Sequence, residues 1–558
     1  MNSTLDLRWQ KTDYSAFFSE TEFESLVEEF SSGIALCNRL FVHNLDWWFE
    51  PLSARNNFGS PLLHHFLCFH LCLKLAKAKR FPRRCLTDCD VLYRGLLALQ
   101  ADGRWDGDIV HTRKRSHLGL LVKRLRAFGR VTASVLFPFL LLGFRNLRQH
   151  RIRQAPTILV DTFVLPGKEE VDRYYAGVFE FLTPEERSAI RLVPTFHGYS
   201  PKQYFATLRL LAGQTDRFLF KESFLRVGDY VHALAHALRV FFLRPPSTPV
   251  GPFDLGRLIR EEVGRFGGLE DAVHGFLNFA FAKRLREAGV RPERVVDWHE
   301  NHGRDRGWNL GFHRFHPGIA RIGFAPGALS QWHLAATPLP SERRAGVLPD
   351  VLLTPSRHLA KAARAADPAL QTETTGAFRF APPQVRAKRR RGPIRLLAPL
   401  SYDPELARDC CRRIRTLLRE VDGVEFIIVY KTHPATNHSS LEALKTECSS
   451  GKESWTSRPF SEELELADAV LGSWTTALLE AVNAGVPAGL LRSPDGLFHN
   501  PIPPGAADEW TFRVDSFNTL APLLAFTRKQ RCSPHPPPSH VLAPPSRKYA
   551  LRLFGLPN

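Results

Sequence analysis

Residues 467–491, ADAVLGSWTTALLEAVNAGVPAGLL, predict a strand, a turn, a helix and a second strand, and this order constrains the fold more than any other segment. The turn places Gly472, Ser473, Thr475 and Thr476 at the start of the helix, where backbone N–H groups and the helix dipole favour a phosphate. Ligands of open α/β sheets gather at the carboxyl ends of strands. The segment therefore predicts a parallel α/β sheet with an anion site at its edge. The alternative is that these residues only cap the helix.

A second predicted strand, residues 426–430, is followed by Lys431, His433 and Pro434. Two basic side chains directly after a strand have no evident structural purpose, and they can donate charge-assisted hydrogen bonds to a phosphate. We therefore expect a nucleotide monophosphate or diphosphate at this edge of the sheet.

The composition favours anionic partners, because 75 Lys and Arg face 56 Asp and Glu, a net charge of +19. No nucleic-acid-binding motif accompanies this charge, so nucleic acid is not an expected partner. The nine cysteines include no C-x-x-C pair, which predicts buried reduced thiols in a cytoplasmic protein. Residues 1–18 are polar and of mixed charge without an apolar run, so we expect no signal peptide. The nearest candidate for a membrane span, residues 131–144, is shorter than the ~20 residues required.

Short apolar runs alternate with helical patterns, which predicts an α/β protein with two Rossmann-like domains that face a cleft. We expect an N-terminal extension at 1–35, a first domain at 36–381 and a second domain at 394–530. A linker rich in Pro, Lys and Arg lies between them at 382–393, and a Pro-rich, irregular tail occupies 531–558.

The first domain contains a helical insertion, residues 111–153, in which basic residues flank the apolar run and, from Arg113 to Arg153, no Asp or Glu occurs. A basic, apolar helix hairpin can lie in the headgroup region of an anionic bilayer. The alternative is a helix pair that covers the sheet with its Arg face solvated. The expected location is the cytoplasm, and peripheral attachment to the inner face of the cytoplasmic membrane stays open.

These motifs resemble those of GT-B glycosyltransferases that build bacterial surface carbohydrate such as capsule and O-antigen. The K-x-H-P motif and the segment from Ala467 to Pro487 are similar to the donor sites of sialyl- and Kdo-transferases, and more loosely to those of teichoic-acid glycerophosphotransferases. DWHENHGRDRGWNLG, from Asp297 to Gly311, looks like a block of surface-polysaccharide proteins, with His302 in place of a Gln and Ala325-Pro326 in place of Tyr-Gln.

The resemblance implies a CMP- or UDP-linked sugar as donor, a departing nucleotide held by protein charges, and no metal or other cofactor. It also implies that Glu480 holds the ribose hydroxyls, although an exposed helix Glu is an equal alternative. The acceptor implied is a glycan or a lipid-linked glycan of the lipopolysaccharide or capsule type.

A catalytic base is expected after the predicted strand 294–298. Glu300 is the first candidate and Asp297 and Asp305 follow, because a carboxylate whose pKa burial raises toward neutrality can take the acceptor proton. The alternative for Glu300 is an ion pair with Arg304. A metal held by His299, Glu300 and His302 is disfavoured, because their spacing is not that of H-E-x-x-H.

Acceptor recognition is expected near residues 44–57, where aromatic, carboxylate and amide side chains concentrate. The predicted acceptor contacts, with two added from the 297–311 block, are Asp46, Trp48, Arg55, Asn56, Asn301 and Arg304. The alternative is that the tryptophans belong to the core.

The leading hypothesis is a metal-independent glycosyltransferase that moves a sugar from a nucleotide to a surface-polysaccharide acceptor. A nucleotide-sugar epimerase of the same fold and a non-catalytic, membrane-associated scaffold of polysaccharide assembly are the alternatives.

Overall fold

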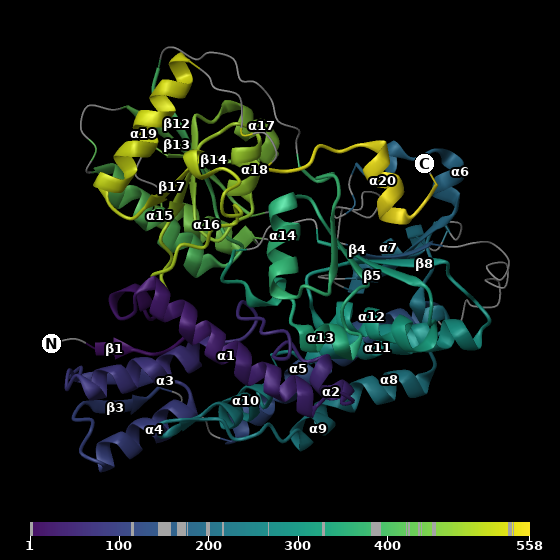
Figure 1. Ribbon diagram of the computed structural model, residues 1–558, viewed down its shortest axis with the longest axis horizontal. Helices are drawn as coiled ribbons and strands as arrows, with labels where there is room; N and C mark the ends of the chain where they lie inside the picture. Colours follow the sequence, from purple (N-terminus) through teal and green to yellow (C-terminus); the bar gives the residue numbers. More distant parts are fainter. Residues whose placement is uncertain are drawn as a thin grey trace.

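The computed structural model describes residues 4–557 with the exception of 10, 113–116, 143–157, 165–174, 176, 197–200, 212, 215–216, 266, 326–329, 381–391, 420, 422–424, 434–435, 437, 449–452, 534–537 and 539–540. Two six-stranded parallel sheets dominate it, one in each of two α/β domains. Figure 1 shows the C-terminal domain above the N-terminal helices, with the N-terminal sheet beside it. The predicted fold class, two Rossmann-like α/β domains, is confirmed.

The C-terminal sheet has the order β14-β13-β12-β15-β16-β17. Its strands are β12 (Ile394–Pro399), β13 (Phe426–Lys431), β14 (Glu453–Thr456), β15 (Ala469–Gly472), β16 (Ala488–Leu491) and β17 (Thr511–Val514). The connecting helices are α15 (Pro404–Arg419), α16 (His438–Cys448), α17 (Phe460–Leu466), α18 (Ala477–Asn483) and α19 (Phe517–Cys532). Counted from its first strand, this order is 3-2-1-4-5-6, so the strand order reverses between β12 and β15. Ligands of doubly wound sheets bind at such a reversal.

The N-terminal sheet has the order β11-β10-β9-β8-β4-β5. Its strands are β4 (Ile158–Val164), β5 (Ile190–Phe196), β8 (Arg294–Trp298), β9 (Ala320–Phe324), β10 (Val351–Thr354) and β11 (Gln371–Thr374). Helices of this domain include α11 (Leu269–Glu287), α12 (Gly303–Phe315), α13 (Pro340–Ala345) and α14 (Arg357–Ala366). Here the strand order reverses between β4 and β8. Residues 217–220 contribute an isolated bridge, from Leu192 to Phe218.

The chain begins with a third unit that the sequence did not reveal. A three-stranded parallel sheet, β1-β2-β3, is covered by helices in the lower part of Figure 1. Its elements are β1 (Thr4–Asp6), β2 (Arg84–Thr87), β3 (Asp108–His111), α1 (Glu20–Leu40), α2 (Leu45–Trp48), α3 (Leu62–Lys77), α4 (Asp90–Ala101) and α10 (Leu255–Val263). Residues 1–35 are therefore not a separate extension, since α1 runs across that boundary.

The described part of the predicted insertion forms one long helix, and the hairpin stays a prediction because its other half lies outside the described residues. Helix α5 (His117–Leu142) contains Pro138, and Val131, Val135 and Leu142 are buried in the core. The rest of the apolar–basic segment, residues 113–116 and 143–153, lies outside the described residues. Across the part of the chain that the structure describes, no helix is both long and apolar enough to cross a membrane.

The predicted irregular tail is also corrected, because it contains α20 (Arg547–Phe554). This helix returns to the N-terminal domain, where Leu551, Leu553 and Phe554 are buried with residues of β4 and β5. Figure 1 shows α20 next to α6 (Pro184–Ser188), beside the N-terminal sheet and apart from α19. The chain therefore passes between the domains twice, once after β11 and once after α19. Most of the predicted linker, residues 382–391, lies outside the described residues.

Candidate functional site

The loop between β8 and α12 forms the N-terminal side of the site. Asp305 Oδ2 accepts hydrogen bonds from the backbone N–H groups of Glu300 and His302, each at 3.0 Å, and thereby caps α12. Asn301 adopts a left-handed conformation with φ of 61°, and its side chain donates to the carbonyl of Ala335 at 3.0 Å. These bonds fix the loop in the shape that presents Glu300.

Helix α12 is itself held tightly against α11. A Cβ atom on Gly307 would lie 2.0 Å from the carbonyl oxygen of Gly275, so the two backbones touch where they cross. Only glycine permits such an approach. Two buried side chains, Arg306 and Glu342, also hold this loop in place. Arg306 donates to Asn301 Oδ1 at 2.9 Å and also to Glu342.

Glu300 and His302 form an ion pair that faces the cleft. Glu300 Oε2 lies 3.2 Å from His302 Nε2, and the side chains keep 39% and 29% of their exposure respectively. Burial raises the pKa of Glu300, but the hydrogen bond and the charge of His302 outweigh it and lower that pKa to about 2. For His302, burial lowers the pKa, but the bond to Glu300 and the charge of Asp271 raise it to about 9.

The predicted tuning of Glu300 is therefore wrong, because its pKa falls rather than rises toward neutrality. Its partner is also not Arg304, whose Nε donates to Asp271 Oδ1 at 2.9 Å. At neutral pH the cleft faces a Glu300 carboxylate paired with a His302 cation.

Asp297 and Asp305, the other two predicted bases, are buried and serve the loop. Asp297 Oδ2 lies 3.1 Å from His299 Nδ1 and accepts from Asn309 Nδ2 at 3.1 Å. Burial raises the pKa of Asp305 to about 6, although its carboxylate accepts two backbone N–H groups. Neither side chain lines a cavity described below.

The C-terminal side of the site comes from the loops at the strand-order reversal. Ser401 and Tyr402 follow β12, and Trp474, Thr475 and Thr476 follow β15. Trp474 has φ of 54°, which is unusual for a bulky residue and marks a sharp turn. Thr475 Oγ1 accepts from the backbone N–H of Ala477 at 3.2 Å, so this predicted donor contact also caps α18.

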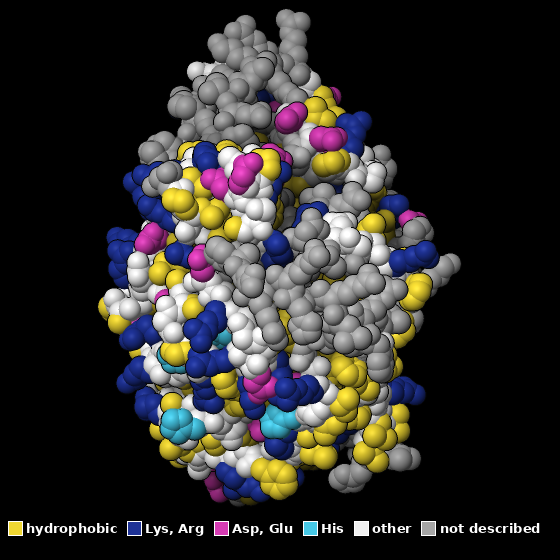
Figure 2. All heavy atoms as spheres, turned by 90° about the vertical axis from the view of Figure 1, so that its right-hand side faces the viewer, with side chains coloured by type: hydrophobic (Ala, Val, Ile, Leu, Met, Phe, Trp, Pro, Cys, Tyr) yellow, Lys and Arg dark blue, Asp and Glu magenta, His cyan; other side chains and the backbone are white. Residues whose placement is uncertain are grey.

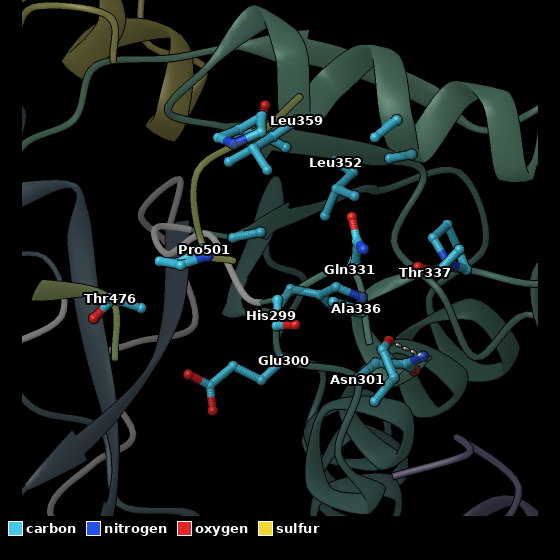
Figure 3. Close-up of a pocket in the computed structure, with 18 of the residues that line it drawn as sticks. His299, Glu300, Asn301, Gln331, Ala336, Thr337, Leu352, Leu359, Thr476 and Pro501 are labelled. Carbon is cyan, nitrogen blue, oxygen red and sulfur yellow. Dashed lines mark hydrogen bonds between the residues drawn. The ribbon is translucent and has the colours of Figure 1, made fainter. Parts of the chain in front are cut away.

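A cavity of about 590 Å³ lies between these two sides. Glu300, His302, Tyr402, Thr475 and Thr476 all line it. A smaller cavity of about 190 Å³ adjoins it and shares Glu300, Ser330, Thr476 and Pro501 with the first. In Figure 3 the carboxylate of Glu300 points toward Thr476 and away from the apolar end at Leu352 and Leu359. The two domains thus enclose one continuous, two-chambered site.

The remaining predicted donor contacts that the structure describes do not line either of these two cavities. Lys431 ends β13, and the ring of His433 lies against the Tyr402 ring, with centroids 5.9 Å apart. Gly472 and Ser473 are buried, and Pro434 lies outside the described residues. The pKa of Glu480 is raised to about 7, because the effect of burial outweighs the opposing effect of the Arg379 charge. Arg379 lines the smaller cavity.

The structure brings two of the predicted acceptor residues to the cleft and not the others. Asn56 lines the larger cavity and Asn301 the smaller one. Asp46 instead pairs with His236 at 2.7 Å and with Arg239 at 3.0 Å.

Trp48 and Arg55 also have structural contacts. Trp48 is fully buried and its indole donates to the carbonyl of Val42 at 3.0 Å. Arg55 is buried and donates to Ser31 Oγ at 3.2 Å and to the carbonyl of Thr337. With Arg304 held by Asp271, these residues position the N-terminal helices rather than line the site.

Several lining residues were not among the predicted ones: Phe58, Ser330, His333, Arg379, Tyr402, Trp474 and His499. Tyr402 and Trp474 had a signal in the sequence, since each lies within three residues of the end of an apolar strand. His333 and His499 had none, because each lies in an irregular segment. Burial and the nearby charge of His302 lower the pKa of His333 to about 3, so it faces the cleft as a neutral imidazole.

Within the described residues, no three His, Cys, Asp or Glu side chains converge in a way that could hold a metal ion.

No family model matches this sequence, and no curated protein sequence matches it. Among solved structures the chain is similar to UDP-GlcNAc 2-epimerase from Methanocaldococcus jannaschii in complex with UDP-GlcNAc and UDP, with a TM-score of 0.40, 13% identity, and coverage of 72% of this chain and 98% of that chain. It is similar to MurG from Acinetobacter baumannii (0.38, 11%, 72% and 99%). It is also similar to WaaB, a lipopolysaccharide outer core galactosyltransferase (0.38, 11%, 72% and 94%). Likenesses at this level carry no argument about activity.

Proposed function

We propose that the protein is a nucleotide-sugar-dependent glycosyltransferase whose acceptor is a surface glycan of the capsule or O-antigen type. The observation that carries this proposal is the position of the larger cavity. It lies at the strand-order reversal of the C-terminal sheet, between Tyr402 and Thr475, and opposite Glu300 and His302 of the other domain. Doubly wound sheets bind nucleotides at such a reversal, and the facing domain leaves room for a second substrate.

The charges of the site suit a departing phosphate. The hydroxyls of Thr475 and Thr476 can donate to phosphate oxygens from one side of the cavity, and the His302 cation faces them from the other. Lys431 adds a positive charge at the end of β13, and the His433 ring lies against Tyr402. Such preorganised donors stabilise the negative charge that develops on a leaving group. Glu300 keeps His302 charged, which gives this carboxylate a role other than that of a base.

Calorimetry with UDP, CMP, CDP and GDP and with UDP-GlcNAc tests the donor site. We expect at least one nucleotide to bind, and we expect Lys431→Ala and His433→Ala to weaken it severalfold. The first removes a positive charge of this domain, and the second removes the ring that lies against Tyr402. Lys445→Ala, on the outer helix α16, is the matched control and keeps wild-type affinity. Wild-type affinity in both test variants would refute the donor-site assignment.

A nucleotide-sugar epimerase is the second candidate function. The protonated His302 favours it, because an epimerase needs a proton-transfer group beside the donor sugar and no acceptor. Incubation of the wild-type protein with the bound nucleotide sugar alone separates the two. An epimerised sugar nucleotide detected by NMR supports the epimerase, whereas release of free nucleotide that rises with added glycan supports the transferase.

We further propose that the first domain rests on an anionic membrane surface. Exposed apolar side chains lie on α5, on α8 (Val227–Leu234), on α9 (His236–Arg239) and on the turn after α9. We name this the α5–α9 surface, and its residues are Leu121, Leu125, Val227, Val231, Leu238, Phe241 and Phe242. The Arg124 guanidinium lies 5.2 Å from the Phe241 ring centroid. Figure 2 shows Lys and Arg outnumbering Asp and Glu, with hydrophobic side chains between them, over the lower, N-terminal part of one face.

Sedimentation with vesicles tests this surface. We expect binding to phosphatidylglycerol vesicles, and a several-fold loss in Phe242→Ser. Leu40→Ser, which removes an exposed leucine at the end of α1, is the control and leaves binding unchanged. Equal binding by all three proteins, or equal binding to neutral vesicles, contradicts the proposal.

A further inference from the structure

A chain of three polar side chains crosses the cleft beside Glu300. His499 Nε2 lies 2.8 Å from Asp495 Oδ2, and His499 Nδ1 lies 3.4 Å from Ser330 Oγ. A carboxylate only accepts hydrogen bonds, so Nε2 of the neutral imidazole carries the proton and Nδ1 is left as an acceptor. The Ser330 hydroxyl therefore donates to His499 Nδ1.

Ser330 lines both chambers of the site, whereas His499 lines the larger of the two. The His499 side chain is 2% exposed. The rings of Trp474 and Phe58 enclose the imidazole, with centroid distances of 4.2 and 6.0 Å. Ser330, and not His499, lines the smaller cavity, so a proton from a hydroxyl bound there reaches the imidazole through the serine.

The Ser330 hydroxyl is also oriented by its own backbone. The N–H of Trp332 donates to Ser330 Oγ at 3.1 Å. With one lone pair taken by this bond and its proton directed at His499, the oxygen has one lone pair left for a third partner in the cleft. Asp495 is fixed as well, because its Oδ1 accepts from the backbone N–H of Leu497 at 3.1 Å.

We propose that Ser330 receives the proton of the attacking hydroxyl in the cleft, and that His499, held by Asp495, receives the serine proton in turn. This inference rests on the proposed transfer. The acceptor O–H bond breaks and its proton moves to Ser330 Oγ, while the Ser330 proton moves to His499 Nδ1. The acceptor oxygen forms a bond to the anomeric carbon, and the bond from that carbon to the phosphate oxygen breaks, with its electron pair leaving on the nucleotide. His499 becomes an imidazolium paired with Asp495.

This assignment fills a role that Glu300 does not. Glu300 is held in an ion pair with His302, and a base of such low pKa gives little driving force for removing a hydroxyl proton. Ser330 belongs to the N-terminal domain, while His499 and Asp495 belong to the loop after β16. The relay is therefore complete only when the two domains stand in the relation described here.

Donor binding and turnover of four full-length proteins test the relay: wild type, Ser330→Ala, Ser330→Thr and His499→Gln. The probe is the nucleotide sugar that binds the wild type in calorimetry, beginning with UDP-GlcNAc, and turnover is read as release of free nucleotide. We expect Ser330→Ala and His499→Gln to lower kcat by about 100-fold or more, which is the usual contribution of general base catalysis. KM and the calorimetric Kd should stay within about threefold of wild type, because these substitutions do not change how the donor binds in the ground state. Ser330→Thr keeps the hydroxyl and restores most of the rate.

His111→Gln is the matched control, because it breaks a similar pair, His111 with Asp90 at 2.9 Å, outside the cleft. It keeps the wild-type rate. Wild-type kcat in Ser330→Ala with intact donor binding overturns the relay alone, whereas a wild-type protein that binds no nucleotide sugar overturns the proposed function and the relay with it. A second measurement needs no turnover: ¹⁵N-histidine NMR of the wild type, assigned with His499→Gln, should show His499 protonated at Nε2. Protonation at Nδ1 instead overturns the relay.

Discussion

Replacing Glu300 by Gln tests the electrostatics of the site most directly. The substitution keeps the shape of the side chain and removes the charge that lies 3.2 Å from His302 Nε2. The pKa of His302 stands at about 9 in the wild type against an ordinary value of 6.5, and Asp271 and Asp305 also raise it. Because Glu300 is partly exposed, solvent screens part of this interaction. We expect the pKa of His302 to fall by about one unit or more, which corresponds to roughly 1.4 kcal/mol per unit.

The consequence for the charge state is large near pH 8. A group with a pKa of about 9 is roughly nine-tenths protonated there, and a fall of one unit leaves roughly half. The pH dependence of stability follows from the direction of each shift. The raised pKa of His302 stabilises the fold below pH 6.5, and this contribution disappears as the pH rises through about 9. The lowered pKa of Glu300 stabilises above its ordinary value of 4.5, and this contribution disappears as the pH falls through about 2.

Titration of His302 by ¹⁵N-histidine NMR measures the shift, and urea unfolding at pH 6 and pH 10 measures the stability difference. We expect Glu300→Gln to be less stable than wild type at pH 6 and equal to it at pH 10. Glu29→Gln is the control, because Glu29 pairs with His70 at 3.5 Å away from the cleft. If His302 titrates at the same pH in wild type and in Glu300→Gln, the ion pair does not set its charge and the reasoning fails.

Three further substitutions test the fold and the site. Arg306→Met should lower the free energy of unfolding by about 3–5 kcal/mol, because it leaves the fully buried Glu342 without its partner, and adding Glu342→Leu should restore much of the loss in urea unfolding. Phe554→Ala should cost about 3–5 kcal/mol as a buried aromatic of the N-terminal core; a loss below 1 kcal/mol would show that α20 does not belong to that core. Thr476→Val should weaken nucleotide binding by up to about tenfold, roughly 1 kcal/mol for one hydrogen bond, with thermal unfolding unchanged, and unaltered calorimetric affinity would remove Thr476 from the donor site.

The parts of the fold that the sequence predicts are those coded by local patterns. Strand, turn and helix follow one another between Ala469 and Asn483 as the apolar runs and the hydroxyl residues indicate. The strand predicted at 294–298 is β8, so the loop that follows it also lies where the sequence predicts. These segments depend on neighbouring residues, so their periodicity carries the information.

The site residues that local sequence patterns miss, or assign to the wrong role, depend on contacts between distant parts of the chain. Ser330 and His499 are 169 positions apart, and neither has a local pattern that marks it as polar lining. The aromatic and polar run that contains Asp46 and Trp48 looked like a sugar site, but His236 and Val42 satisfy those polar groups instead. The pKa of Glu300 could not be foreseen either, because its sign depends on whether His302 reaches it in space.

The two passages of the chain between the domains restrict how they can move. A body attached at one point can turn in any direction, but two separate attachments leave one easy rotation, about the line that joins them. A rotation about that line would separate Ser330 from His499, which belong to different domains. Proton transfer between these two residues therefore requires the domains to be held in the arrangement that brings them together.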